Sequence, residues 1–404
     1  MIVLFLVIAA VFVALHWYVW RRLVRDTTVR GSAPRRIGTV LIVVLPALTL
    51  LAVRDDLPGI PFRWEGIVDW PGFLWLAVFL YLVLALVVGE AVRPLLRRAL
   101  AQRDAKRAEP AVAPPGTGSE PPVADDAPAL LARRVFVSRV VGGSAAAVAL
   151  GTVGYGTASL LRGPQIKRLT VPLAKLPRGA HGFRIAVVSD IHLSPLLGRD
   201  FAQHVVDTIN STQPDLIAVV GDLVDGSVED LSTAVAPLAQ LRARHGSYFV
   251  TGNHEYFHDA RRWVGVVRDL GLHPLENART ELPGFDLAGV NDVRGESEGQ
   301  GPDFARALGD RDPARASVLL AHQPVVIDEA VRYGVDLQLS GHTHGGQLWP
   351  GNLLFGLTNP TVAGLDRYGD TQLYVSRGAG AWGPPVRVGA PSDITVVELA
   401  SRQA

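Results

Sequence analysis

The chain has 404 residues, a formal net charge of +1 and no cysteine, and its mean hydropathy of +0.23 is high for a purely soluble protein. We therefore expect part of the chain to lie in a lipid bilayer. Without cysteine, disulfides and thiolate metal sites are excluded. The near-zero net charge gives no support for binding through a basic surface, so we expect no nucleic-acid partner.

Transmembrane helices are predicted in the first 162 residues, which contain four apolar stretches: 1–20, 37–53, 71–89 and 135–161. Each stretch is close to the roughly 20 residues that span a bilayer as a helix. Small residues from Gly142 to Ala147 in the fourth stretch allow helix backbones to approach closely. The sequence therefore predicts an α-helical transmembrane bundle of about four helices.

The basic residues of the loops predict the orientation of these helices, because Arg and Lys are retained on the cytoplasmic side. The first loop carries six arginines against one acid, Asp26, and the third loop is again basic. The second loop mixes basic and acidic residues. We expect an external N-terminus and a multi-pass protein of the cytoplasmic membrane, with everything after Arg162 on the external side.

Changes in composition divide the chain into four parts. Residues 1–100 hold three transmembrane helices, 101–134 a Pro-rich acidic cytoplasmic linker, 135–162 a fourth transmembrane helix or signal-like segment, and 163–404 one domain. Arg133 and Arg134, followed by Val135 and Phe136, resemble a twin-arginine export signal. Alternatively, these arginines anchor a fourth helix on the cytoplasmic side. Both interpretations deliver the last domain to the outside.

The last 240 or so residues alternate short apolar runs with segments of helical length. Runs of Val, Ile, Leu and Ala predict strands that are buried on both faces, which requires helices on both sides of a sheet. We predict strands at 184–188, 215–220, 248–250, 317–320 and 335–339, and helices at 199–212 and 228–244. This pattern is typical of one layered α/β domain.

A polar cluster directly follows each of five predicted strands. The clusters are Asp190-Ile191-His192, Gly221-Asp222-Leu223-Val224-Asp225, Gly252-Asn253-His254-Glu255, Ala321-His322-Gln323-Pro324 and Gly341-His342-Thr343-His344. In an α/β sheet this order gathers them at the carboxyl ends of the strands, where ligands bind. Each cluster alone has an ordinary explanation as a turn or a helix cap. Together they hold five of the eleven histidines, which points to a shared site.

Carboxylate, amide and imidazole groups suit a pair of divalent ions of the Mn²⁺, Fe, Zn²⁺ or Mg²⁺ type. One carboxylate, such as that of Asp222, has two oxygens and can bridge two ions about 3.5 to 4 Å apart. His342 and His344 alternate along an extended segment, so each can serve a different ion. Gly345 and Gly346 leave room for the backbone to pass close to the ions or the substrate.

The order of these motifs resembles that of the calcineurin-like metallophosphoesterases. The strings "VSDIHLSP", "VVGDLVDG", "TGNHEYF", "LAHQP" and "LQLSGHTHGGQLWP", with the late "SRGAGAWGPPVRVGAPSDITVVEL", are similar to those of the membrane-associated bacterial phosphodiesterase-type members. The resemblance covers roughly residues 165 to 400. It implies a four-layer α/β/β/α metallophosphoesterase sandwich after the transmembrane bundle.

The resemblance also implies a role for each motif residue. Asp190, His192 and His344 would hold one metal ion, Asn253, His322 and His342 the other, and Asp222 would bridge them. His254 would be the catalytic residue that contacts the phosphoryl oxygen or protonates the leaving group. Asp225 and Glu255 would orient the ligands from behind.

These observations predict a membrane-anchored, dinuclear metal-dependent phosphoesterase that uses a metal-activated hydroxide. We expect phosphodiesters to be preferred over phosphomonoesters, and an envelope or lipid-linked substrate, since the domain is tethered beside the bilayer. One alternative is a transport or sensing protein with a regulatory phosphoesterase domain, for which ionisable residues inside the membrane would be needed. Only His16 and Glu90 come near. A metal-binding but inactive receptor is disfavoured by the complete ligand set and His254.

Overall fold

The computed structural model describes residues 2–54, 61–108 and 127–403. The chain folds into two compact units. Met1–Leu51 and Leu74–Gly154 form the first, here called the membrane unit, and Ala52–Phe73 and Tyr155–Ala404 form the second, the sheet unit. The sheet unit is therefore assembled from two stretches that are far apart in the sequence.

Long apolar helices make up the N-terminal part of the chain, as predicted. They are α1 (Ile2–Trp20), continued by the π-helical turn η1 (Arg21–Arg25), α2 (Ala33–Ala52), α3 (Phe62–Ala108) and α4 (Ala127–Leu161). Each of the four contains a stretch that is long and apolar enough to cross a membrane: Leu6–Arg25, Ala33–Ala52, Trp64–Arg103 and Ala132–Leu161. Helices α3 and α4 extend well beyond the predicted apolar stretches. The central part of the predicted linker, 109–126, lies outside the described residues.

The ionisable residues Glu90 and His16 of the membrane unit each contact a neighbour on another helix. Glu90 of α3 accepts a hydrogen bond from the Tyr18 hydroxyl at 2.8 Å and forms a 2.8 Å ion pair with Arg22. The guanidinium of Arg93 lies 3.9 Å from the same carboxylate. His16 hydrogen bonds to the Phe12 carbonyl and stacks on the ring of Phe79. These contacts join α1 to α3.

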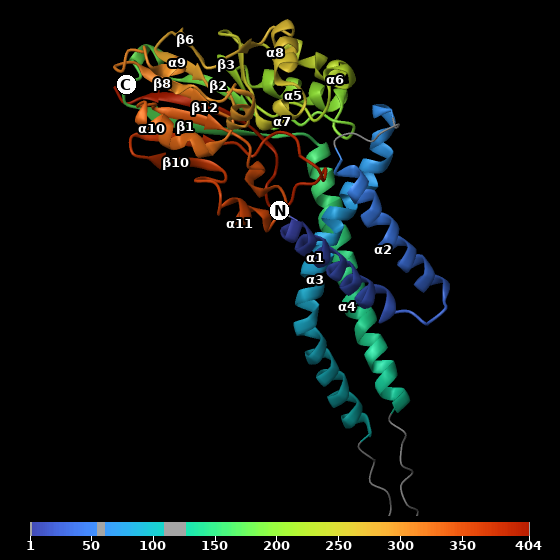
Figure 1. Ribbon diagram of the computed structural model, residues 1–404. Coiled ribbons are helices and arrows are strands. Elements are labelled where there is room, and N and C mark those ends of the chain that lie inside the picture. The colour runs from blue at the N-terminus through green and yellow to red at the C-terminus, as the bar shows by residue number, and fades with distance from the viewer. Residues whose placement is uncertain (1, 55–60, 109–126, 404) are drawn as a thin grey trace, which may run out of the picture. The chain divides into compact units, whose positions relative to one another are not determined.

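The sheet unit contains two six-stranded sheets (Figure 1). The first has the order β1 (Gln165–Leu173), β12 (Asp393–Ser401), β2 (Phe183–Val188), β3 (Leu216–Val220), β4 (Ser247–Val250) and β5 (His273–Pro274). The second has the order β10 (Gly364–Tyr368), β11 (Thr371–Val375), β9 (Leu337–Ser340), β8 (Ala316–Leu320), β7 (Phe285–Gly289) and β6 (Ala278–Leu282). Strands β2 to β5 run parallel, as do β7, β8, β9 and β11.

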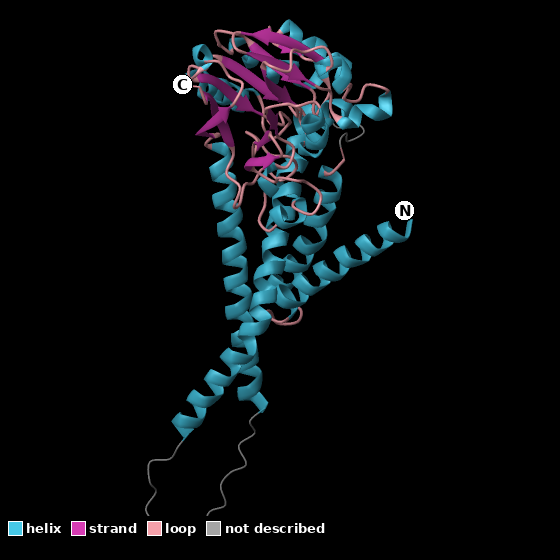
Figure 2. Cartoon of the chain, turned by 90° about the vertical axis from the view of Figure 1, so that its left-hand side faces the viewer, coloured by secondary structure: helices cyan, strands magenta, loops and turns pink. Residues whose placement is uncertain are grey.

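Helices cover the outer faces of both sheets, whose strands Figure 2 shows in magenta. On the first sheet they are α5 (Arg199–Ser211), α6 (Val228–Val235) and α8 (Ala260–Asp269), and on the second α9 (Phe304–Leu308) and α10 (Ile327–Arg332). The short helices α7 (Asn253–Phe257) and α11 (Gly351–Phe355) follow β4 and β9 in the chain. Short 3₁₀ turns connect them: η2 (Arg178–Ala180), η3 (Ala236–Gln240), η4 (Val293–Glu298), η5 (Pro324–Val326) and η6 (His344–Gly346).

Three apolar clusters hold the layers together. One lies between the sheets and joins side chains such as Ile185 and Val220 to Phe285 and Leu339. The second packs α5, α6 and α8 on the first sheet, and the third packs α9 and α10 on the second sheet. The order of layers is helix, sheet, sheet, helix, which confirms the predicted α/β/β/α sandwich.

The predicted helix at 228–244 is wrong in its second half. Helix α6 ends at Val235, and a 3₁₀ turn follows at Ala236–Gln240. Pro237 lies at the start of that turn. Proline has no amide hydrogen, and its ring clashes with the carbonyl one turn earlier, so it ends the α-helix there.

Candidate metal centre

The five polar clusters lie at the carboxyl ends of parallel strands from both sheets. Asp190 follows β2, Asp222 follows β3 and Asn253 begins α7 after β4, whereas His322 follows β8 and His342 follows β9. The two sheets pack face to face through a shared core, so these strand ends meet. The structure therefore brings side chains from both halves of the sandwich to one place.

Several residues of these clusters have left-handed backbone conformations. The φ angle is positive for Asp190 (53°), His192 (49°), Asp222 (53°), His342 (71°) and His344 (52°). For residues with a side chain this conformation costs of order 1 kcal/mol or more each, and it persists where the surroundings impose it. Such a concentration of strain is typical of a functional site.

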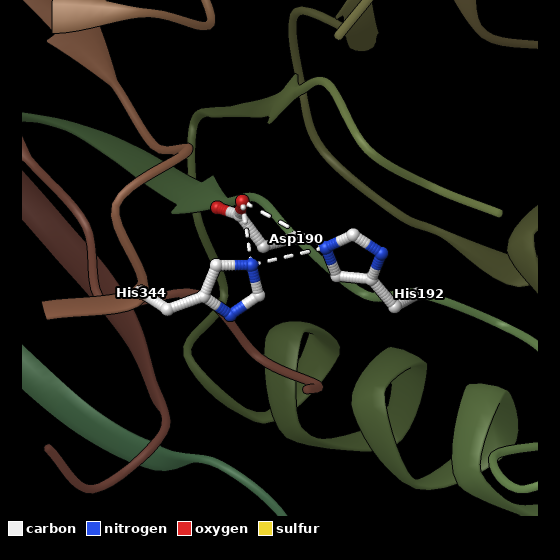
Figure 3. Close-up of side chains that lie close together, drawn as sticks. All are labelled: Asp190, His192 and His344. Atoms are coloured by element: carbon white, nitrogen blue, oxygen red, sulfur yellow. Dashed lines mark hydrogen bonds and ion pairs between the residues drawn. The ribbon is translucent and has the colours of Figure 1, made fainter. Parts of the chain in front are cut away.

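Asp190, His192 and His344 form one group of converging side chains, shown in Figure 3. The Nε2 atoms of the two imidazoles are 3.1 Å apart, and that of His344 lies 3.4 Å from Asp190 Oδ1. All three side chains are buried. The backbone amide of His342 donates to the Asp190 carboxylate at 3.0 Å, which fixes that carboxylate beside the imidazoles.

A second group consists of Asp222, His322 and His342. Asp222 Oδ2 lies 3.1 Å from His322 Nε2 and 3.8 Å from the Nε2 atom of His192 in the first group. The carboxylate of Asp222 is thus located between the two groups. His342 and His344, which are two residues apart, fall into different groups as predicted, but the segment is not extended, since both residues have a positive φ.

A third group links His254 to the same place. Asp225 Oδ1 lies 2.7 Å from His254 Nδ1 and 2.9 Å from His192 Nδ1. Burial favours a neutral carboxyl, yet the two imidazoles hold the pKa of Asp225 well below its usual range. Burial disfavours a charged His254, but the bond to Asp225 and the nearby Asp222 outweigh it and raise the pKa of His254 to about 9. The imidazole of His254 is therefore protonated at neutral pH.

The remaining histidines have electrostatic environments that suit a cation nearby. Burial and the neighbouring His322 lower the pKa of His342 to about 4, and burial and Arg387 hold the pKa of His344 well below its usual range. Both rings are neutral at pH 7, as metal ligands must be. Burial opposes a charged His322, but Asp222 and Asp190 outweigh it and raise its pKa well above the usual value. This corner of the site favours positive charge.

The donor set fits divalent ions. The Oδ1 atom of Asn253 is buried and has no hydrogen-bond partner among the described residues, whereas the buried Nε2 atom of His322 lies 3.1 Å from Asp222 Oδ2. The other ring nitrogen of His322 donates to the Val220 carbonyl at 2.8 Å, so Nε2 is the ring atom that faces the other ligands. Asp225 fixes the ring of His192 in the same way. Buried acceptors without a donor are costly, and a bound ion satisfies them.

Glu255 holds two loops of the site in place through hydrogen bonds. Its carboxylate accepts hydrogen bonds from the backbone amides of Asp222 (3.1 Å), Leu223 (2.7 Å) and Gly252 (2.6 Å). It thereby ties the loop after β3 to the loop after β4. The carboxylate of Asp222 in turn accepts from the amide of His254 at 2.9 Å.

Arg387 is a site residue that the sequence patterns did not reveal. Its buried guanidinium donates to the carbonyls of His344 (2.8 Å) and Arg377 (2.7 Å) and to that of Gly380. These hydrogen bonds fix the loop that contains His344. Its late position in "GPPVRVG" follows no strand and obeys no spacing rule. Only its place within a string already noted for its resemblance could have drawn attention to it.

The chain is similar to known proteins over this part of its length. A family model described as calcineurin-like phosphoesterase matches residues 183–346. An uncharacterized metallophosphoesterase of Helicobacter pylori is 37% identical over 256 residues, which cover 62% of this chain and 68% of that protein. The uncharacterized metallophosphoesterase YkuE of Bacillus subtilis is 30% identical over 288 residues, which cover 67% of this chain and 98% of YkuE.

Two vertebrate relatives are named as transmembrane proteins. One is a transmembrane protein with metallophosphoesterase domain from Bos taurus, 40% identical over 253 residues that cover 58% of this chain and 57% of the relative. A protein of the same name from Danio rerio is 37% identical, with 59% of its length covered. The match thus spans less than two thirds of these two relatives.

Proposed function

Because the chain belongs to the calcineurin-like metallophosphoesterases, we propose that it hydrolyses phosphodiesters in preference to phosphomonoesters, at the external surface of the cytoplasmic membrane. The observation that carries the proposal is the position of Asp222 between two groups of buried imidazoles and carboxylates. A carboxylate in that position is what a pair of divalent ions requires. The substrate in this proposal is a lipid-linked or envelope phosphoester.

In the proposed centre, the two groups hold one ion each. Asp190, His192 and His344 would hold the first ion, Asn253, His322 and His342 would hold the second, and Asp222 would be shared between them. The chemistry that such ions supply when bound is neutralisation of the phosphoryl oxygens and activation of the attacking water. The metal is of the Mn²⁺, Fe, Zn²⁺ or Mg²⁺ type.

His254 completes the reaction in this scheme. Asp225 accepts a hydrogen bond from His254 Nδ1. The Nε2 atom of His254 therefore faces the groups of ligands, 4.0 Å from Asp222 Oδ2. As the bond between phosphorus and the leaving oxygen breaks, a proton held at Nε2 passes to the departing alkoxide. Proton transfer from a positioned side chain typically contributes 10² to 10⁴-fold in rate.

The external location is supported by the loops and by the composition of the sheet unit. That unit includes Ala52–Phe73, which connects α2 to α3 and contains the first turns of α3, together with Tyr155–Ala404 after the fourth span. Two parts of one compact unit must lie on the same side of a membrane, as the alternating topology requires. The arginines of the first and third loops favour the outside for that side.

The test uses the full chain in detergent, stripped of metal and reloaded with Mn²⁺, Zn²⁺ or Mg²⁺. Turnover of bis(p-nitrophenyl) phosphate and of p-nitrophenyl phosphate is compared. We expect metal-dependent hydrolysis with a higher kcat/KM for the diester. A preference for the monoester would make the protein a phosphatase, and the absence of turnover with every metal, despite bound ions, would favour the receptor hypothesis.

The alternative of a transporter or sensor gains no support from the membrane unit. Glu90 and His16, the two residues that such a function would use, already have partners within the bundle. These contacts give both residues a structural role, because they link α1 to α3. We therefore retain hydrolysis as the function.

A further inference from the structure

A small cavity of about 70 Å³ adjoins the proposed metal centre inside the sheet unit. His254 and Asp225 are among the residues that line it. Part of its wall comes from the Ala52–Phe73 stretch, through Glu65, Asp69 and Phe73. The family model, which matches residues 183–346, does not extend to that wall. The wall is therefore a feature of this chain that the phosphoesterase motifs do not explain.

Asp69 faces this cavity without a partner. Its side chain is only 9% exposed, and among the residues that the structure describes it makes no hydrogen bond or ion pair. A buried carboxylate without a partner is costly, so it implies a ligand that compensates its charge. Glu65, one helical turn earlier on α3, lines the same cavity.

Aromatic rings complete the cavity. Trp382 and Phe73 line it beside the two acids. Gln347 fixes the backbone of Trp382 by donating to its carbonyl at 2.8 Å and accepting from its amide at 3.1 Å. Carboxylates next to the faces of aromatic rings form an environment that recognises ammonium groups. Arg54 and His258 also line the cavity, and Arg54 is exposed.

Residues that line the cavity are close in sequence to two membrane spans. The second span ends at Ala52, and the third begins within two residues of Phe62. Residues of this wall are therefore within a few helical turns of the lipid headgroups. A group bound there can belong to a molecule that remains in the bilayer.

We propose that this cavity is a subsite for a cationic amino-alcohol group of the substrate, so that the enzyme favours phosphoesters of amino alcohols. The inference rests on the proposed phosphoesterase function. Glu65 and Asp69 neutralise the ammonium group, Trp382 and Phe73 cover it, and the phosphoryl group extends past His254 to the metal ligands. The same chemistry occurs in lipid headgroups and in soluble esters.

The first experiment compares two soluble diesters that release the same p-nitrophenolate. Metal-loaded full-length protein in detergent is assayed on p-nitrophenyl phosphorylcholine, which carries a cation, and on ethyl p-nitrophenyl phosphate, which carries none. We expect kcat/KM to be about tenfold or more higher for the cationic ester, because a charge pair away from bulk water is worth more than 1.4 kcal/mol. Asp69→Asn and Glu65→Gln should each lower this ratio several-fold, and Asp69→Glu should retain most of it.

The matched control is Asp310→Asn. Asp310 is 81% exposed and pairs with Arg279 outside the cavity, so its replacement should leave the ratio unchanged. A ratio near one in the wild-type protein, or a ratio that Asp69→Asn does not change, would overturn the subsite.

A binding measurement separates failure of the subsite from failure of the proposed function. Phosphorylcholine and ethyl phosphate are titrated into the full-length protein by calorimetry, which needs no turnover. If neither ester is hydrolysed, the phosphoesterase function fails, and tighter binding of phosphorylcholine that is lost in Asp69→Asn would still support the subsite. Equal binding of both probes would reject it.

Vesicles identify the source of the amino alcohol. Reconstituted protein is assayed for release of the headgroup from vesicles of phosphatidylethanolamine and of phosphatidylglycerol. Faster release from phosphatidylethanolamine supports the subsite with a lipid as the source. Turnover of the soluble cationic ester without headgroup release supports it with a soluble ester as the source, and a preference for phosphatidylglycerol contradicts it.

Discussion

His254 and Asp222 lie within 4.0 Å of each other but are expected to fail in different ways. His254→Ala removes the proton donor and leaves all seven proposed metal ligands in place. We expect it to retain bound metal and to lose about 10² to 10⁴-fold in kcat. Metal content by mass spectrometry and kcat on the diester measure the two effects separately.

Asp222→Asn should lose both properties. An amide has one acceptor oxygen, so it cannot bridge two ions as a carboxylate does. We expect less bound metal and no measurable turnover. Wild-type activity in either variant would contradict the roles proposed for these two residues.

Gly252 gives a second prediction at this scale. A Cβ at this position would overlap Asp222 Oδ1 and lie 2.5 Å from the Asp222 amide nitrogen. Gly252→Ala should therefore displace the bridging carboxylate and abolish metal-dependent activity. Gly265→Ala is the matched control, because a Cβ there meets nothing within 4 Å on helix α8, and alanine should stabilise the helix by about 0.5 to 1 kcal/mol. Loss of metal in the control and not in Gly252→Ala would refute this explanation.

The sequence predicted the side chains of the site where they directly follow an apolar run. Asp190, Asp222 and His322 each come immediately after a strand, so strand order alone gathers them. Arg387 and Asp69 follow no such run. Arg387 acts from an irregular loop, and Asp69 lies in a helix more than 100 residues earlier in the chain. Only the packing of the sheet unit brings Arg387 against His344 and Asp69 to the cavity that His254 also lines.

Strand β12 is the element on which the first sheet most clearly depends. It pairs with β1 on one side and with β2 on the other. Ile394, Val396, Val397 and Leu399 are buried in it. Burying four such side chains contributes about 6 to 12 kcal/mol, which is comparable to the whole stability of a typical domain.

A chain that ends after Ser392 should therefore not fold its sheet unit, although every proposed metal ligand is present. Limited trypsin digestion and metal content measure this. A chain that ends after Ser401 is the control, because Arg402 and Gln403 are exposed, and it should resemble the wild type. A protease-resistant, active protein that lacks β12 would contradict the observed strand order.

The extent of the helices was less predictable than their existence. Apolar length identifies a membrane span, but it does not reveal that α3 continues to Ala108. Beyond Gly89 the sequence is rich in Arg, Ala and Leu, which are good helix formers. A polar helix of this kind gives no hydropathy signal, so the prediction ended where the apolar residues ended.

At the scale of the whole molecule, the absence of cysteine makes the orientation directly testable. Asp310→Cys places one thiol on the exposed surface of the sheet unit, and Arg98→Cys places one in the basic C-terminal part of α3. We expect a membrane-impermeant maleimide to label the first in intact cells and the second only after permeabilisation. The reverse pattern would place the sheet unit in the cytoplasm.

The division of the sheet unit between two distant stretches has a consequence for biosynthesis. Residues 52–73 leave the ribosome first, and the strands that they pack against are made only after residues 74–154 have been synthesised and inserted. The acidic residues that line the cavity therefore stay exposed until the last strands have been synthesised. Folding of the catalytic layers and insertion of the final span must occur in a fixed order. A secreted fragment that begins at Tyr155 would be made without these acidic residues, and it would hydrolyse simple diesters without the selectivity of the complete chain.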